Sequence, residues 1–162
     1  MHNTTLYNIY YKIANKFIIL LVNAAERILL YMQVSNKQFD AMVTKAMDEL
    51  PQEYIAGLNN VLITFENNPS TEQRRRQNLQ AWQTLFGLYE GIPRVQRGNN
   101  YNLVLPDKIT LFKGPLEAAS NSEPELQEHI KRTLWHEIAH YYGLGHDRIH
   151  ALEDGAKTDL NR

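Results

Sequence analysis

The chain has 162 residues, with 17 basic and 18 acidic side chains, so its net charge does not recruit nucleic acid or an anionic membrane. This length is sufficient for one domain with a substantial core. Cysteine is absent, which excludes disulfides and thiolate ligands, so any metal ion must be held by histidine, aspartate or glutamate.

Residues 1–31 differ in composition from the rest of the chain. Residues 6–31 are mostly apolar or aromatic, but the longest strongly apolar run, 17–22, is too short to span a bilayer, which needs about 20 residues. A signal-like segment, an amphipathic interfacial helix and an extension from a misassigned start codon all fit this composition. We favour the extension, followed by one domain over 32–162. The predicted location is the cytoplasm, with export or membrane association through residues 1–31 as the alternative.

The predicted domain begins with a helix and a strand. Ser35 is a suitable N-cap and forms a capping box with Gln38, and apolar residues continue at helical spacing until Pro51 ends the helix. Residues 61–65 are rich in β-formers and predict the first strand. The polar stretch 70–83 predicts a loop or short surface helix, whose three consecutive arginines indicate a solvated face rather than a binding patch.

Two more strands and a long helix follow. The second strand is predicted at 85–89, and the third at 109–112, where Gly114 and Pro115 end it. Ser122 and Glu125 predict a capping box at the start of the last helix. This helix has an apolar stripe that can pack on a sheet, formed by Leu126, Ile130, Leu134 and Ile138.

The most informative segment, residues 136–146, reads His-Glu-Ile-Ala-His-Tyr-Tyr-Gly-Leu-Gly-His. His136 and His140 are four residues apart, so both imidazoles leave one face of the helix and can bind one ion. Gly143 can end the helix in a left-handed conformation, which allows His146 to supply a third ligand. Three protein ligands leave a position open for water, as in catalytic zinc sites. Glu137 then stands where a general base is needed, and its place beside the apolar stripe predicts a raised pKa.

Zinc is favoured because the ligands are imidazoles. Asp147 is a candidate for a supporting hydrogen bond to a ligand imidazole, with a surface carboxylate as the equal alternative. His150 could replace His146 as ligand, although an exposed or packed position is the favoured interpretation. Tyr141 and Tyr142 could donate to an oxyanion, although core and rim positions are more usual for tyrosines at a helix end. A further histidine, His129, lies two turns before His136, too far to ligate, and is predicted to be structural.

The motif resembles that of the zincins, and residues 32–153 resemble more closely the small bacterial minimal zincin metallopeptidases. The supporting phrases are Leu-Phe-Gly-Leu-Tyr-Glu-Gly-Ile-Pro at 85–93, Leu-Pro-Asp-Lys-Ile at 105–109 and the segment 135–148. The resemblance implies an α+β fold, with a small mixed β-sheet packed against an N-terminal helix and a zinc-binding active-site helix. It departs from the metzincin pattern because no methionine follows Met47. This departure weakens the expectation of vigorous general proteolysis.

We therefore expect a zinc-dependent metallopeptidase that hydrolyses peptide bonds in a peptide or protein substrate, through a zinc-activated water with Glu137 as general base. A non-catalytic zinc protein, in which the ion stabilises the fold or an interface, is the alternative. An extended substrate could add to one strand of the sheet. The candidate strands are residues 109–112 or the second strand, formed by Leu85, Phe86, Gly87, Leu88 and Tyr89.

Overall fold

The computed structural model describes residues 33–98 and 104–149, which have an α+β fold. The predicted extension, residues 1–31, lies outside the described residues. In the described part, no helix combines the length and the apolar character that a membrane crossing needs. The elements in chain order are α2 (Asn36–Glu49), α3 (Gln52–Ala56), β1 (Val61–Glu66), α4 (Thr71–Arg76), β2 (Gly87–Glu90), the 3-10 turn η1 (Arg94–Gln96), β3 (Asp107–Phe112), α5 (Lys113–Ala118) and α6 (Glu123–Tyr141).

The three strands form one mixed sheet, which confirms the predicted type of sheet. Their order in it is β1-β3-β2. The central strand β3 is parallel to β1, with Ile63 opposite Ile109, and antiparallel to β2, with Gly87 opposite Leu111. Five of the six residues of β3 are buried. The two edges of the sheet are therefore β1 and β2, and of these two it is β2 that packs closely against the motif-bearing helix α6.

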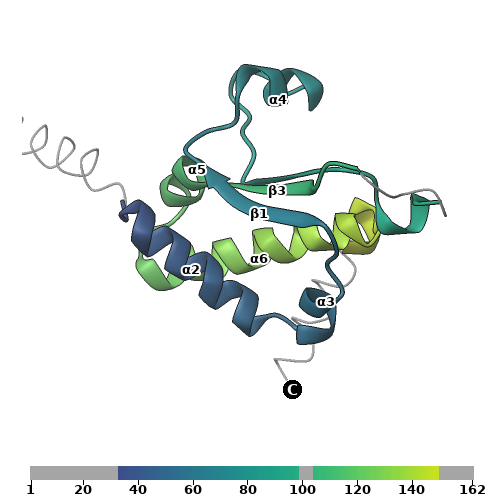
Figure 1. Cartoon of the computed structure of the whole chain (residues 1–162). Helices are drawn as coiled ribbons and strands as arrows, with labels where there is room; N and C mark the ends of the chain where they lie inside the picture. Colours follow the sequence, from purple (N-terminus) through teal and green to yellow (C-terminus); the bar gives the residue numbers. More distant parts are fainter. Residues whose placement is uncertain (1–32, 99–103, 150–162) are drawn as a thin grey trace, which may run out of the picture. The chain divides into compact units, whose positions relative to one another are not determined.

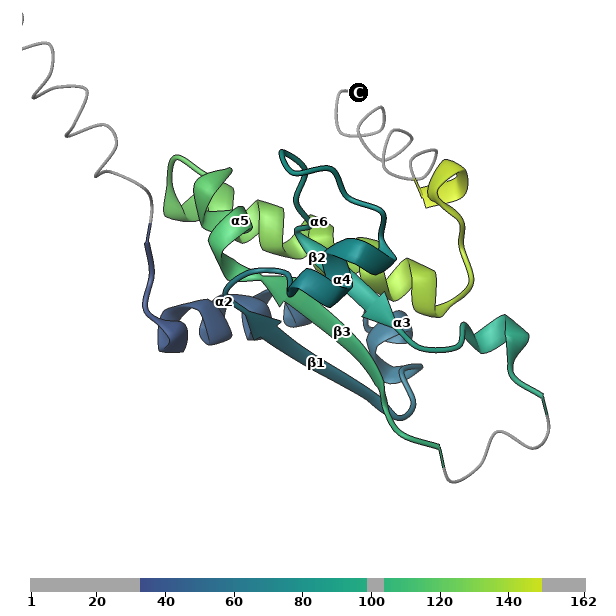
Figure 2. The ribbon, with the colours of Figure 1, turned by 90° about the horizontal axis from the view of Figure 1, so that it is seen from above.

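Helices cover both faces of the sheet. Figure 1 shows α2 and α6 beneath it and α4 above it, and the view in Figure 2 places α4 over the strands. The core lies between the sheet and the α2–α6 layer, where the predicted apolar stripe of α6 is fully buried. A leucine or isoleucine buried in this way stabilises the fold by roughly 1.5–3 kcal/mol. The fully buried apolar residues of this layer include Phe39, Ile109, Leu111, Leu126, Ile130, Leu134 and Ile138.

The predicted start of α2 is confirmed. The Ser35 hydroxyl accepts the Gln38 amide at 3.2 Å, and the Gln38 side chain accepts the Ser35 amide at 2.9 Å. These bonds satisfy two of the donors that a helix start leaves unpaired. The preceding residue is held as well, because the Val34 amide donates to the buried Glu117 carboxylate at 2.8 Å. The first helix is thus fixed against α5 at its N-terminal end.

Three predictions about element ends need correction. The third strand ends at Phe112 as predicted but begins at Asp107, two residues earlier than predicted. Gly114 and Pro115 then lie inside α5, where Pro115 occupies the first turn and its missing N–H leaves no bond unmade. At the start of α6, Ser122 is the cap, but the Glu125 carboxylate accepts from the Asn121 amide at 2.7 Å instead of completing the box. The second strand begins two residues later than predicted, at Gly87.

The polar stretch after β1 contains a short surface helix, α4, as predicted. Its arginines are used locally: Arg75 and Arg76 pair with Glu72, and Arg74 donates to the carbonyls of Gln80 and Ala81. The arginines therefore stabilise the surface of α4 and the loop that follows it. This agrees with the prediction that the run of arginines is a solvated face rather than a binding patch.

Candidate metal centre

Three histidines converge at the C-terminal end of α6. His136 and His140 project from the helix with ring centroids 4.8 Å apart. His146 begins the helical segment 146–149, and its ring centroid lies 5.2 Å from that of His136 and 4.6 Å from that of His140. One potential ligand nitrogen from each residue lies within 4.8 Å of the other two. The predicted cluster is therefore brought together, and it is a candidate metal site.

A left-handed glycine turns the chain from α6 toward His146. Gly143 has a φ of 90°, a backbone conformation that side-chain-bearing residues rarely adopt. Its amide donates to the His140 carbonyl at 2.9 Å, and the Leu144 amide donates to the Ala139 carbonyl at 3.0 Å. These bonds satisfy carbonyls that the helix end leaves free. The predicted role of Gly143 is confirmed.

Replacing Gly143 by alanine is expected to lower the free energy of unfolding by about 1–2 kcal/mol, because an L side chain is strained in this conformation. A Cβ atom would also meet the Val95 side chain, but that residue is 73% exposed and its side chain can move away. Urea unfolding of Gly143→Ala, Val95→Ala and the double variant separates the two effects. Full rescue by Val95→Ala would contradict the backbone explanation.

His140 is oriented by a backbone carbonyl. Its Nδ1 atom lies 3.0 Å from the Leu144 oxygen, which can only accept, so Nδ1 carries the proton and Nε2 offers its lone pair. Burial, and then the neighbouring His146, lower the pKa of this imidazole. A lowered pKa favours the neutral form, which is the form that binds metals. This partner was missed at the sequence level because a backbone carbonyl leaves no signal in residue type.

Glu137 is buried beside the histidines. The residue is 6% exposed, and burial raises the pKa of its carboxyl to about 7, against the opposing effect of a hydrogen bond from the Tyr89 backbone. Burial removes water from around the Glu137 carboxyl group and so disfavours its charged form, which explains why the pKa is raised. The predicted desolvation of Glu137 is thus observed, and its backbone partner on β2 is an addition to the prediction.

Gly87 allows β2 to lie directly against Glu137. A Cβ atom at this position would meet the Thr133 side chain at 2.7 Å and the Glu137 carboxylate oxygen at 2.8 Å. Only glycine therefore permits this distance between the strand backbone and α6. A glycine inside a strand is the sequence signal for such a close approach.

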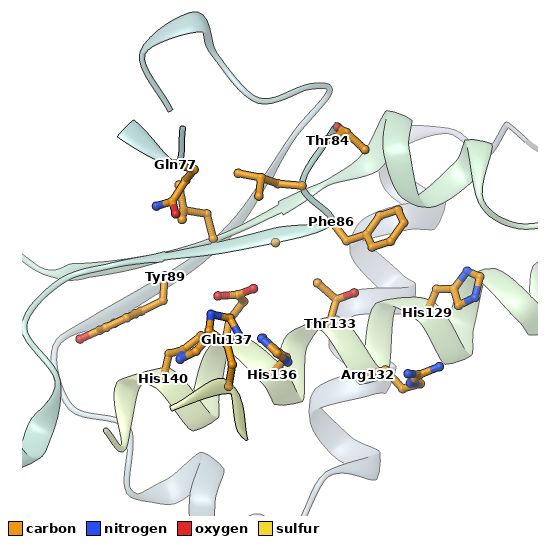
Figure 3. Close-up of a pocket in the computed structure, with 14 residues that line it drawn as sticks. Gln77, Thr84, Phe86, Tyr89, His129, Arg132, Thr133, His136, Glu137 and His140 are labelled. Atoms are coloured by element: carbon orange, nitrogen blue, oxygen red, sulfur yellow. The ribbon is translucent and has the colours of Figure 1, made fainter. Parts of the chain in front are cut away.

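A cavity of about 560 Å³ opens between β2 and α6, and its lining includes all three histidines and Glu137. Figure 3 shows His136, His140 and Glu137 on the α6 side of this cavity. The five residues predicted as a substrate strand, residues 85–89, all line it. The alternative prediction, that an extended substrate adds to residues 109–112, is wrong. These residues belong to β3, whose backbone is hydrogen-bonded on both sides and has no edge to offer.

The other predicted residues have less central positions. Asp147 is exposed, and its supporting role stays a prediction, while His150 lies outside the described residues. The Tyr141 hydroxyl accepts the Asn59 amide at 3.1 Å, and the Tyr142 hydroxyl donates to the Tyr54 carbonyl at 2.8 Å. Both tyrosines therefore have the core and rim positions that are usual at a helix end.

Among the comparisons with known proteins, a match to one family model bears on this site. A search of curated proteins found no match. A solved structure, a conserved hypothetical protein from Thermo thermophilus, is 20% identical, with a TM-score of 0.44 over 66% of this chain and 92% of that one. A family model described as zincin-like metallopeptidase matches residues 58–156, which include β1, β2, β3, α6 and the three histidines. This match spans more than half of the chain, and the chain therefore belongs to the zincin-like metallopeptidase family.

Proposed function

We propose that this chain is a zinc-dependent peptidase in which three histidines hold the ion and Glu137 is the general base. The observation that carries the proposal is the convergence of the His136, His140 and His146 nitrogens within 4.8 Å, in a cavity that also contains a buried carboxyl group. A purely structural site would need neither the adjacent cavity nor the buried Glu137.

The donor set fits zinc. A tetrahedral ion with bonds of about 2.0–2.1 Å keeps its ligand nitrogens roughly 3.4 Å apart, so side-chain movements on the order of 1 Å suffice here. His140, which donates through Nδ1, presents Nε2 as a free ligand atom. When bound, zinc polarises a substrate carbonyl and lowers the pKa of a water molecule to about 7.

Glu137 supplies the proton transfers in this proposal. Its carboxylate accepts a proton from the attacking water and returns it to the leaving amine. The pKa near 7 belongs to the protein without a cation nearby. A neighbouring positive charge favours the ionised carboxylate, so metal loading and formation of the base are coupled.

The edge strand β2 is the proposed substrate-binding strand. The Phe112 amide donates to the Phe86 carbonyl at 2.8 Å, which makes these two residues a hydrogen-bonded pair. Such pairs alternate along an antiparallel ladder, so the peptide groups of Gly87 and Tyr89 point away from β3. An extended peptide or protein segment can therefore add to this edge beside Glu137.

Cleavage of a mixed peptide library by the 162-residue chain tests the proposal. We expect the zinc-loaded protein to cut library members, a chelator to abolish cutting, and added zinc to restore it, with products identified by mass spectrometry. A folded protein that binds one zinc ion per chain but cuts nothing would favour the non-catalytic alternative. A protein that binds no zinc would overturn the assignment of the three histidines.

A further inference from the structure

The cavity continues along α6 beyond the histidines. Thr133, Arg132 and His129 line it in the direction of the helix N-terminus, and Figure 3 shows these side chains on the side away from His140. Arg132 precedes His136 by four residues, which is about one helical turn, and His129 precedes it by about two turns. Both lie within about 40° of His136 around the helix. One face of α6 therefore carries the metal ligands and then this second group.

Arg132 is the permanent cation of the cavity. Among the fourteen described residues that line it, Arg132 is the one lysine or arginine and Glu137 the one carboxylate. Its neighbour Lys131 is paired, with Glu49 at 3.3 Å and Glu128 at 2.8 Å. No ion pair joins Arg132 to a carboxylate in the described part of the chain, which leaves the guanidinium for a ligand.

His129 is held by a hydrogen bond at this end of the cavity. The Ser120 hydroxyl donates to the Leu116 carbonyl at 2.7 Å, so it must accept from His129 Nδ1, which lies 2.9 Å away. This bond fixes the imidazole against the loop before α6, in agreement with the structural role that the sequence predicted. Arg132, whose guanidinium is always protonated, is the lasting positive charge that this end of the cavity offers to an anion.

We propose that Arg132 is a specificity residue that binds a carboxylate of the substrate, so that the preferred substrates are acidic peptides. The inference rests on the proposed peptidase function. Four residues, or slightly more than one helical turn, separate Arg132 from His136 by about 6 Å along the helix. An extended peptide advances about 3.3–3.6 Å per residue. The bound carboxylate thus belongs to a residue within about two positions of the scissile bond, as an aspartate or glutamate side chain or as the peptide's C-terminus.

Guanidinium and carboxylate groups form paired, charge-assisted hydrogen bonds. Because Arg132 is exposed, the expected preference is about three- to tenfold rather than larger. The positive charge of a metal ion in the same cavity adds to the attraction for anionic peptides.

Peptide retention on the immobilised, zinc-loaded Glu137→Gln variant of the 162-residue chain tests the inference, because this variant is expected to bind peptides without consuming them. Three pools of degenerate hexapeptides are compared by mass spectrometry: one glutamate with an amidated C-terminus, glutamine in its place with an amidated C-terminus, and that glutamine pool with a free C-terminus. We expect one of the two carboxylate-bearing pools to be enriched about three- to tenfold over the neutral pool. Which pool is enriched identifies the side chain or the C-terminus as the ligand.

Variants of Arg132, made in the Glu137→Gln protein, show whether this residue causes the preference for carboxylate-bearing peptides. Arg132→Gln should remove it, and Arg132→Glu should reverse it, so that the neutral pool is retained more than the carboxylate-bearing pools. Arg75→Gln, which removes the same charge from the exposed surface of α4, should retain it. Equal retention of acidic and neutral pools, or an unchanged preference in Arg132→Gln, would overturn the inference alone. If no variant retains any peptide, the proposed peptidase function fails as well.

Discussion

Replacing Glu137 by glutamine is expected to slow peptide hydrolysis about 10²–10⁴-fold while the zinc content stays the same. Glutamine has nearly the same shape and can still accept the Tyr89 hydrogen bond, but it cannot take a proton from water at neutral pH. None of the three histidines is changed, so the metal ligands remain in place. The measurement is kcat/KM on a library peptide, with zinc quantified in the same protein samples.

The control is Glu53→Gln, which removes the same charge from an exposed position on α3. It should cleave like the parent protein. A Glu137→Gln variant that retains activity would exclude Glu137 as the base. A variant that loses its zinc together with its activity would show that Glu137 supports the metal site instead.

The same substitution is expected to stabilise the metal-free protein at high pH. Unfolded Glu137 releases its proton near its ordinary pKa of 4.5, whereas the folded protein retains it up to about pH 7. Between these values the folded state binds more protons, so the free energy of unfolding falls as the pH rises. The full penalty is present above pH 7 and is of order 3 kcal/mol, at about 1.4 kcal/mol per pKa unit.

Urea unfolding in the presence of a chelator, at pH 5 and pH 8, measures this penalty. Glu137→Gln should exceed the parent in stability by about 2–3 kcal/mol at pH 8 and by much less at pH 5. Glu53→Gln, measured in parallel, controls for the loss of one negative charge at an exposed position. A stability difference between Glu137→Gln and the parent that is equal at both pH values would contradict the raised pKa.

Local chemistry allowed much of the fold to be predicted. The Ser35–Gln38 box, the β-rich run 61–65 and the stripe on α6 each depend on residues close in sequence, and the structure contains all three elements. In contrast, α5 was missed. The Gly114–Pro115 pair that predicts a break is tolerated in a first helical turn, and the Gly114 amide bonds to the distant Asn67 carbonyl at 2.8 Å.

The candidate metal site was also predictable in part. The spacing of His136, His140 and Gly143 follows from helix geometry and a helix-ending turn, so the convergence on His146 could be expected. The order β1-β3-β2 could not, because strand pairing depends on contacts between segments far apart in the chain. That order makes β2 an edge strand, and it leaves the central strand β3 without a free edge to which a substrate could add. The position of Arg132 in the same cavity also depends on this arrangement.

The shortness of β2 has a consequence for the size of substrate that the edge can recognise. The strand has four residues, and its outward peptide groups are those of Gly87 and Tyr89, of which the Tyr89 amide already bonds to Glu137. A segment of three or four residues contacts every remaining group, because each residue advances about 3.4 Å along the edge. A longer polypeptide gains no further backbone bonds there. Binding to this edge therefore reaches its limit with oligopeptides, and an unfolded protein has no advantage over its own short fragments.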